Sequence, residues 1–242
     1  MKKITFILIL LALGLFKTSY ASEPVKLQSP DGQLELKFEV IGGLPQYSLD
    51  RAGKPVVLPS KMGFTLEWRD DLAHAFVLKD TKYSTFDEAW EPVWVLKDTK
   101  YSTFDEAWEP VWGEEAQIRN HYNEMLVTLE QPVGSVESMD HSTEKKATVM
   151  QIRFRLYDDG LGFRYEFPME NALVYFWIKE ELTEFAMTGD HTAWWIPGDL
   201  DTQEFNFTQS RLSEIRGLWE AGHKDGGWPW TGFSPTGVQT AL

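Results

Sequence analysis

The feature that most constrains the fold is a strict alternation of apolar and polar residues in short runs. In the stretch QLELKFEV, the apolar residues Leu34, Leu36, Phe38 and Val40 alternate with charged residues. Successive side chains of a β-strand point to opposite faces, so a period of two is typical of a strand with one buried face. The preceding SPDGQ supplies a turn.

The same alternation recurs twice in MQIRFRLYDDGLGFRYEFP. Its two runs, residues 150–156 and 163–167, are separated by the Asp- and Gly-rich stretch DDGLG, which predicts a β-hairpin. Shorter strand-like runs are PQYSL, KPVVL, FTLEW, MLVTLE and LVYFWI, and helical periodicity is confined to SRLSEIRGLWE (Ser210–Glu220). Many short strands joined by polar turns predict an all-β fold, a β-sandwich.

The first twenty-one residues have the pattern of a secretory signal peptide. Two lysines precede an apolar run over residues 4–16, and the small residues Ser19 and Ala21 suit cleavage after Ala21. The alternative, a membrane anchor, is disfavoured because the run is short for a membrane span and no later stretch is longer or more apolar. The sequence therefore predicts export and a mature domain over residues 22–242 without a membrane span.

Charge and cysteine content restrict the partners and the compartment. The net charge of −14 becomes −17 when the three lysines of the signal peptide are removed, and such a surface repels nucleic acid and anionic membranes. Neutral ligands or cations are favoured instead. The chain has no cysteine, so an exported domain of this length must be held by its core, which suits a bacterial periplasm. Its eleven Trp, fifteen Phe and eight Tyr residues suit strands and sugar contacts.

An exact tandem repeat lies in the first half of the chain. The segment VLKDTKYSTFDEAWEPVW occupies residues 77–94 and recurs unchanged over residues 95–112. A solenoid needs at least about three units that drift apart in sequence, so we interpret the repeat as a recent duplication or an error in the sequence. The even length preserves strand facing, and a fold can use one copy and leave the other as a loop, because extra loop length costs little.

Four long stretches resemble glycoside hydrolase family 97, in the order of the family pattern. They are FDEAWEPVWGEEAQIRNHYNE (104–124), YDDGLGFRYEFP (157–168), GDHTAWWIPGDLDTQEF (189–205) and SRLSEIRG (210–217). The likeness covers almost the whole mature chain and is strongest to periplasmic α-glucosidases of starch utilisation. The family pattern holds the repeated segment once.

The resemblance implies a β-super-sandwich of the galactose-mutarotase-like type, with mostly antiparallel strands. In the family this domain is followed by a (β/α)₈ catalytic barrel and a small β-domain. The final run GVQTAL begins like a strand and stops at Leu242, which also predicts that more protein follows. The resemblance further implies an exported, calcium-dependent α-glycosidase of the α-glucosidase type, acting on α-linked gluco-oligosaccharides from starch. Glucosidase against galactosidase activity, and inversion against retention, stay open.

No catalytic residue is expected in this chain. Glycoside hydrolysis usually needs two carboxyl groups, about 5 Å apart for retention or about 6.5–9.5 Å apart for inversion, and no pair stands out by spacing. In the family both belong to the barrel. The resemblance implies instead that Glu204, in DTQEF, is a calcium ligand. Calcium takes six to eight oxygen ligands, so the barrel must complete the site.

Other candidates each have a structural alternative. Asp199 and Asp201 could bind a metal, but loop aspartates more often form turn hydrogen bonds. Trp194 and Trp195 could stack on sugar rings or pack in a core. His121 could act as a base, although no nucleophile accompanies it.

The polar run IRNHYNE is ambiguous in an all-β chain. It contains Arg119, Asn120, Asn123 and Glu124, which could form a buried network or border an active-site cleft. No phosphate-binding loop, zinc spacing or Ser–His–Asp arrangement accompanies it. Two other functions stay open: a free-standing carbohydrate-binding module for α-glucans without catalysis, and a non-catalytic scaffold that binds a protein partner.

Overall fold

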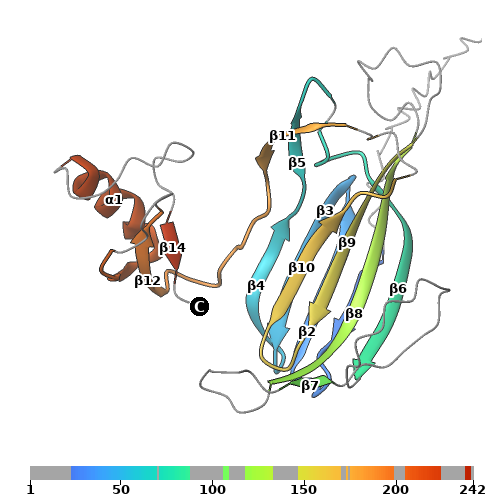
Figure 1. Cartoon of the computed structure of the whole chain (residues 1–242), viewed down its shortest axis with the longest axis horizontal. Coiled ribbons are helices and arrows are strands. Elements are labelled where there is room, and N and C mark those ends of the chain that lie inside the picture. Colours follow the sequence, from blue (N-terminus) through green and yellow to red (C-terminus); the bar gives the residue numbers. More distant parts are fainter. Residues whose placement is uncertain are drawn as a thin grey trace, which may run out of the picture.

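A computed structural model describes a β-sandwich with a small sheet and one helix beside it (Figure 1). All strand pairs are antiparallel, which confirms the predicted all-β class. No helix in the described part of the chain is long and apolar enough to cross a membrane. The described residues are 23–69, 71–87, 106–108, 118–132, 147–169, 173, 175–198, 205–224 and 238–240.

The first sheet of the sandwich contains the first four strands in the order β1-β2-β3-β4. These strands are β1 (Val25–Gln28), β2 (Leu34–Ile41), β3 (Leu44–Arg51) and β4 (Lys54–Lys61). In β2, the four apolar residues of the alternating run are all buried, as predicted. The turn from β2 to β3 is Gly42-Gly43, with φ of 59° and 84°, and glycine reaches these angles without strain.

The second sheet has the order β10-β9-β8-β6, and β7 also pairs with β8. Its strands are β6 (Val77–Asp87), β7 (Glu106–Trp108), β8 (Ile118–Gln131), β9 (Thr148–Leu156) and β10 (Leu161–Glu166). The predicted hairpin is confirmed as β9 and β10, which pair from Leu156 and Leu161 onward. Its turn is closed by a 2.9 Å hydrogen bond from the Tyr157 amide to the Gly160 carbonyl.

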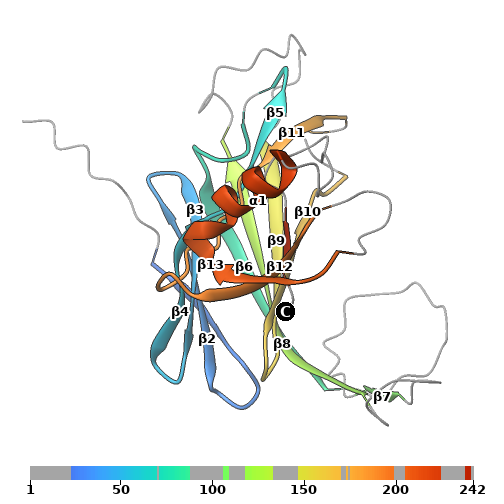
Figure 2. The ribbon, with the colours of Figure 1, turned by 90° about the vertical axis from the view of Figure 1, so that its left-hand side faces the viewer.

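One core fills the space between the two sheets, which Figure 2 shows nearly edge-on. Phe38 from the first sheet and Phe154 from the second meet with ring centroids 5.7 Å apart, and both side chains are fully buried. Apolar residues of β2, β3, β8 and β9 supply most of this core. Because each strand directs every second side chain inward, the alternation in the sequence is what builds this apolar layer.

A second, smaller core lies in the sheet β13-β12-β14 and helix α1 (Figure 1). Its elements are β12 (Thr192–Pro197), β13 (Thr208–Arg211), a 3₁₀ turn (Leu212–Glu214), α1 (Ile215–Lys224) and β14 (Val238–Thr240). The helix predicted from Ser210 therefore begins later, because Ser210 and Arg211 pair with β12. Long-range strand pairing overrides the local helical pattern here.

The segment that follows β11 connects the sandwich to the small sheet. After the ribbon of β5 (Phe64–Glu67) and β11 (Trp177–Glu181), residues 182–187 run along β4. Backbone hydrogen bonds of 2.8–2.9 Å join this segment to residues 58, 61 and 63. The β4 edge of the first sheet is thereby covered, which leaves β1 as its open edge.

Candidate functional site

The segment that carries the predicted calcium ligand connects two paired strands. Glu204 lies outside the described residues, as do Asp199 and Asp201. The strands on either side are described: Trp195 of β12 pairs with Thr208 of β13. Neighbouring strands lie about 4.8 Å apart, so the segment between them begins and ends near the same end of this strand pair.

A buried tryptophan anchors this hairpin. The Trp195 side chain is fully buried, and its indole nitrogen donates a 3.0 Å hydrogen bond to the Ser210 hydroxyl of β13. Trp219 of α1 packs in the same small core. The alternative of core packing is therefore correct for Trp195. Its neighbour Trp194 is half exposed on the opposite face, and is free to contact a ligand or another domain.

A second set of contacts fixes the entry to β12. The Asp190 carboxylate accepts hydrogen bonds from the Ser213 amide at 2.9 Å and from its hydroxyl at 2.8 Å. These bonds hold the pKa of Asp190 below its ordinary value. Arg211 donates to the Asp190 carbonyl at 3.0 Å. The two strands that flank the Glu204 segment are thus joined at their far ends as well as at Trp195.

The polar run IRNHYNE forms part of β8, and its ambiguity is resolved for Glu124. The Glu124 side chain is only 4% exposed, and its carboxylate is paired with Arg153 and, at 2.9 Å, with Arg155. Arg153 also binds Glu166 of β10 at 2.6 Å. These four residues form an ion cluster on the outer face of the second sheet, in which Glu124 is buried and its three partners are partly exposed.

Electrostatics within this ion cluster favour the charged forms. The hydrogen bond from Arg153 lowers the pKa of Glu166, burial opposes it, and Arg164 adds to the lowering. The same bond to Glu166 raises the pKa of Arg153. Arg155 also lies over the Tyr122 ring, 4.5 Å from its centroid. Every charged group is paired, which is typical of a structural cluster rather than a catalytic one.

The remaining residues of IRNHYNE take separate places. Asn123 donates a 2.8 Å hydrogen bond to the Gln28 carbonyl and so links β8 to β1 across the sandwich. Arg119 is exposed, whereas Asn120 and His121 are partly buried. Within the described ranges, no group of three or more His, Asp or Glu side chains is placed to hold a metal ion. His121 therefore joins no described metal site.

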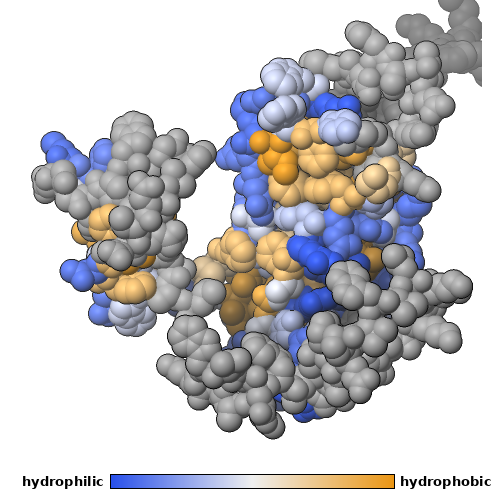
Figure 3. All heavy atoms as spheres, in the orientation of Figure 1, coloured by the Kyte–Doolittle hydropathy of each residue, from blue (hydrophilic) through white to orange (hydrophobic). Residues whose placement is uncertain are grey.

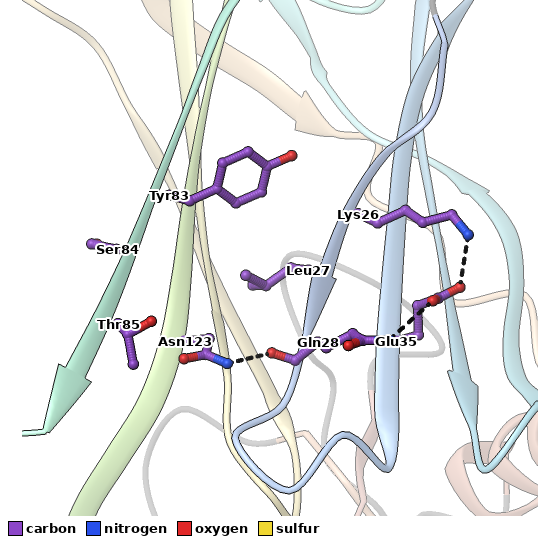
Figure 4. Close-up of a pocket in the computed structure, with 8 residues that line it drawn as sticks. All are labelled: Lys26, Leu27, Gln28, Glu35, Tyr83, Ser84, Thr85 and Asn123. Carbon is purple, nitrogen blue, oxygen red and sulfur yellow. Dashed lines mark hydrogen bonds and ion pairs between the residues drawn. The ribbon is translucent and has the colours of Figure 1, made fainter.

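A groove of about 380 Å³ lies between the open edges of the two sheets (Figure 4). Tyr83 of β6 is 49% exposed along this groove, and Leu27 of β1 lies buried at its floor. Lys26 and Glu35 form an ion pair of 3.3 Å on the rim. The groove is lined by Lys26, Leu27, Gln28, Glu35, Tyr83, Ser84, Thr85 and Asn123.

The chemistry of this groove suits a neutral ligand with one apolar face. Its only charged lining residues, among those described, are the paired Lys26 and Glu35, so the rim carries no net charge. Tyr83 offers an aromatic ring, while Gln28 and Thr85 offer polar groups. Sequence reasoning missed this site, because its residues come from strands that meet only in the folded sandwich.

A second missed feature is a set of exposed large apolar side chains on and beside the β5–β11 ribbon, namely Trp68, Tyr175, Trp177 and Ile178. These side chains are between 50% and 84% exposed, and all five residues of β11 are exposed. Trp68 also has a φ of 59°, which is rare for an aromatic residue. Figure 3 shows further apolar side chains over this end of the molecule. Burying such side chains against another domain would be favourable.

Comparison with known proteins places this chain in a family. A family model described as glycosyl-hydrolase 97 N-terminal matches residues 27–100 and 95–231. The chain belongs to glycoside hydrolase family 97, as its N-terminal domain. The two matched segments overlap over residues 95–100, inside the tandem repeat, as expected for a family pattern that contains the repeated segment once.

Solved structures agree with this assignment. The chain is similar to a glycoside hydrolase family 97 enzyme from Pseudoalteromonas sp. strain K8, solved in complex with panose and with acarbose. Identity is 26% over 78% of this chain, with TM-scores of 0.61 and 0.62. It also shares its fold with a beta-arabinopyranosidase, at 18% identity over 76% of this chain and a TM-score of 0.56. The family 97 domain described here spans about a quarter of these enzymes, 24% to 26% of their length.

Proposed function

We propose that this chain is the N-terminal domain of an exported, calcium-dependent α-glycosidase of the α-glucosidase type, acting on starch-derived oligosaccharides in the periplasm. The observation that carries the proposal is the family match across residues 27–231. Two further observations support it: the signal-like first twenty-one residues, and the panose and acarbose complexes of the similar enzyme from Pseudoalteromonas.

Within this proposal, Glu204 supplies one ligand to calcium. A carboxylate oxygen suits a hard cation, but calcium takes six to eight oxygens, and no described group of acidic residues provides the others. In this proposal, the catalytic barrel and water supply the remaining ligands. The paired strands β12 and β13, joined by the hydrogen bond between Trp195 and Ser210, hold the two ends of the Glu204 segment near one end of the strand pair.

The barrel of the same polypeptide is the proposed partner of this domain. The exposed apolar side chains on and beside the β5–β11 ribbon support an interface, because burying such side chains is favourable. Docking of this domain and completion of the calcium site would then depend on each other. The domain shapes one wall of the active site, and no hydrolysis is expected from it alone.

The test uses the full-length enzyme that contains this domain and its barrel. Glu204→Ala is expected to lower both calcium affinity, measured by calorimetry, and the rate of maltooligosaccharide hydrolysis. Glu220→Ala, which changes an exposed carboxylate of α1, is the matched control and is expected to change neither. If the Glu204→Ala enzyme keeps the calcium dependence of the wild type, Glu204 is not a ligand.

The groove between the sheets favours a second candidate function, a carbohydrate-binding module for α-glucans. Its exposed Tyr83 ring and a rim without net charge suit a sugar, which has an apolar face and neutral hydroxyl groups. Calorimetric titration of the isolated chain with maltoheptaose tests it. Saturable heat that is lost when Tyr83 and its equivalent in the repeat, Tyr101, are both changed to Ala supports a binding module, and absence of heat leaves a scaffold role.

A further inference from the structure

Two strands that are far apart in the chain continue each other along β8. The pairing of Asp87 with His121 is followed directly by the pairing of Glu106 with Asn120. The antiparallel register therefore advances by one residue on β8 while the partner chain advances by nineteen. Nothing else in the register changes at this point, because Ala107 then pairs with Arg119 and so continues the same ladder.

The skipped interval has the length of the tandem repeat. Residues 88–105 number eighteen, and residues 106–108 are the second copy's equivalents of residues 88–90. Together, β6 and β7 thus spell VLKDTKYSTFDEAW, the first fourteen of the eighteen residues of the repeated sequence, read partly from each copy. Residues 88–105 themselves lie outside the described part of the chain.

We propose that the two copies are interchangeable partners of β8, so that residues 95–105 can take the places of residues 77–87. Each replacing residue is identical to the one replaced, and every side chain in the ladder stays the same. The arrangements differ only in where the extra eighteen residues leave the strand. This inference does not depend on the proposed function.

The position of β6 in the sheet favours such an exchange. β6 is the last strand in the order β10-β9-β8-β6, so the only described strand whose backbone pairs with it is β8. Either arrangement adds the same number of residues to a connection, and closure entropy changes slowly with loop length. The groove is retained after exchange, because Tyr101 and Thr103 replace Tyr83 and Thr85.

Exchange would move the extra segment along the open edge of the sandwich. With the first copy in β6, the additional residues leave after Asp87; with the second copy, they precede Val95 at the opposite end of the strand. An eleven-residue strand is about 35 Å long, which is the distance over which the exit point would shift. The repeat would thus provide two states of one sheet edge with the same core.

Disulfide trapping tests the proposal, because the chain has no cysteine of its own. Lys82 lies opposite Leu126 in the ladder, and paired strand positions are close enough for a disulfide. The variants K82C/L126C and K100C/L126C are refolded in a glutathione buffer, and their disulfide yields are measured by peptide mass spectrometry. Doubling a loop changes its closure equilibrium by only about threefold, so the two yields are expected to agree within about tenfold.

The pair E220C/L126C, with one cysteine on α1, gives the background yield. A yield for K100C/L126C at this background, with K82C/L126C crosslinked, would overturn the exchange. Absence of a crosslink in K82C/L126C would overturn the register on which the inference rests.

Proline substitution gives an independent measurement in the intact chain. Ser84→Pro restricts the backbone of the first copy within the ladder, and Ser102→Pro does so in the second. Each single change is expected to lower the melting temperature slightly, because the other copy takes its place, whereas the double change lowers it strongly. Equal losses in Ser84→Pro and in the double variant would contradict the proposal.

Discussion

The indole nitrogen of Trp195 donates its hydrogen bond to the hydroxyl of Ser210, 3.0 Å away on the neighbouring strand. Both side chains are buried, so this bond satisfies a polar group that water does not reach. It also ties β12 to β13 at the base of the segment that carries Glu204.

Ser210→Ala should therefore destabilise the small sheet by about 1–3 kcal/mol, the cost of a buried donor without a partner. Urea denaturation followed by tryptophan fluorescence measures the change. Thr192→Ala, at the exposed start of β12, is the control and should change stability by less than about 0.5 kcal/mol. Equal stability of the two variants would show that the bond contributes nothing.

Glu124→Gln should destabilise the sandwich by about 3 kcal/mol. It leaves Arg153 and Arg155 without their shared buried carboxylate, and the partial exposure of both arginines keeps the cost at the lower end of the usual range. Glu180→Gln changes a carboxylate on the fully exposed β11 and serves as the control. A loss no greater than in the control would mean that the ion cluster is not stabilising.

The contribution of Glu166 should depend on pH. Its pKa lies below the ordinary value of 4.5 in the folded chain, chiefly through Arg153, so its stabilisation is present above 4.5 and is lost as pH falls towards the folded pKa. Glu166→Gln should cost about 1–2 kcal/mol at pH 7 and progressively less below pH 4.5. Urea denaturation from pH 7 to pH 3 measures both proteins, and a constant difference would refute the expectation.

Deletion of one repeat should preserve the fold and increase its stability. Removing residues 88–105 leaves the same sequence as removing 95–112, and it joins β6 directly to β7 in the observed register. The gain is about 2–3 kcal/mol, because the native state no longer closes an eighteen-residue loop. Thermal denaturation compares the two chains. Loss of a cooperative transition would mean that the second copy is required.

The exported protein should begin at Ser22. Cleavage after Ala21 removes three lysines, and the mature mass measured by spectrometry would show it directly. Replacing Ala21 with a bulky residue, as in Ala21→Trp, should leave the precursor uncleaved. A mature mass that retains residues 1–21 would instead favour an anchored form.

The strands were predictable where one local pattern decides them. Alternation placed Phe38 and Phe154 in the core, and both are fully buried. The same pattern says that Trp194 and Trp195 face opposite sides but not which one lies inside, because that depends on the position of α1. The helix boundary failed for a related reason: the pairing of Arg211 with Thr192 is invisible to a local window.

The positions of the candidate sites depend on which strands are neighbours, and local patterns in the sequence do not reveal this. Glu124 and Arg155 are thirty-one residues apart, and they meet because β8 and β9 are neighbours. The groove needs Lys26 and Tyr83 to come from the edges of different sheets. Sequence reasoning has no access to either arrangement without the topology, whereas Glu204 was suggested by resemblance alone and stays a prediction.

The segment that runs along β4 also has a mechanical consequence. Leu182, Glu184 and Ala186 already bond to the sandwich edge, so only a few residues remain as a tether to the small sheet. A force that pulls the small sheet away would load these backbone hydrogen bonds before it reached either core. The connection is therefore bonded firmly to the sandwich and leaves only a short link before β12. This short link limits how far β12 and β13 can move relative to the sandwich.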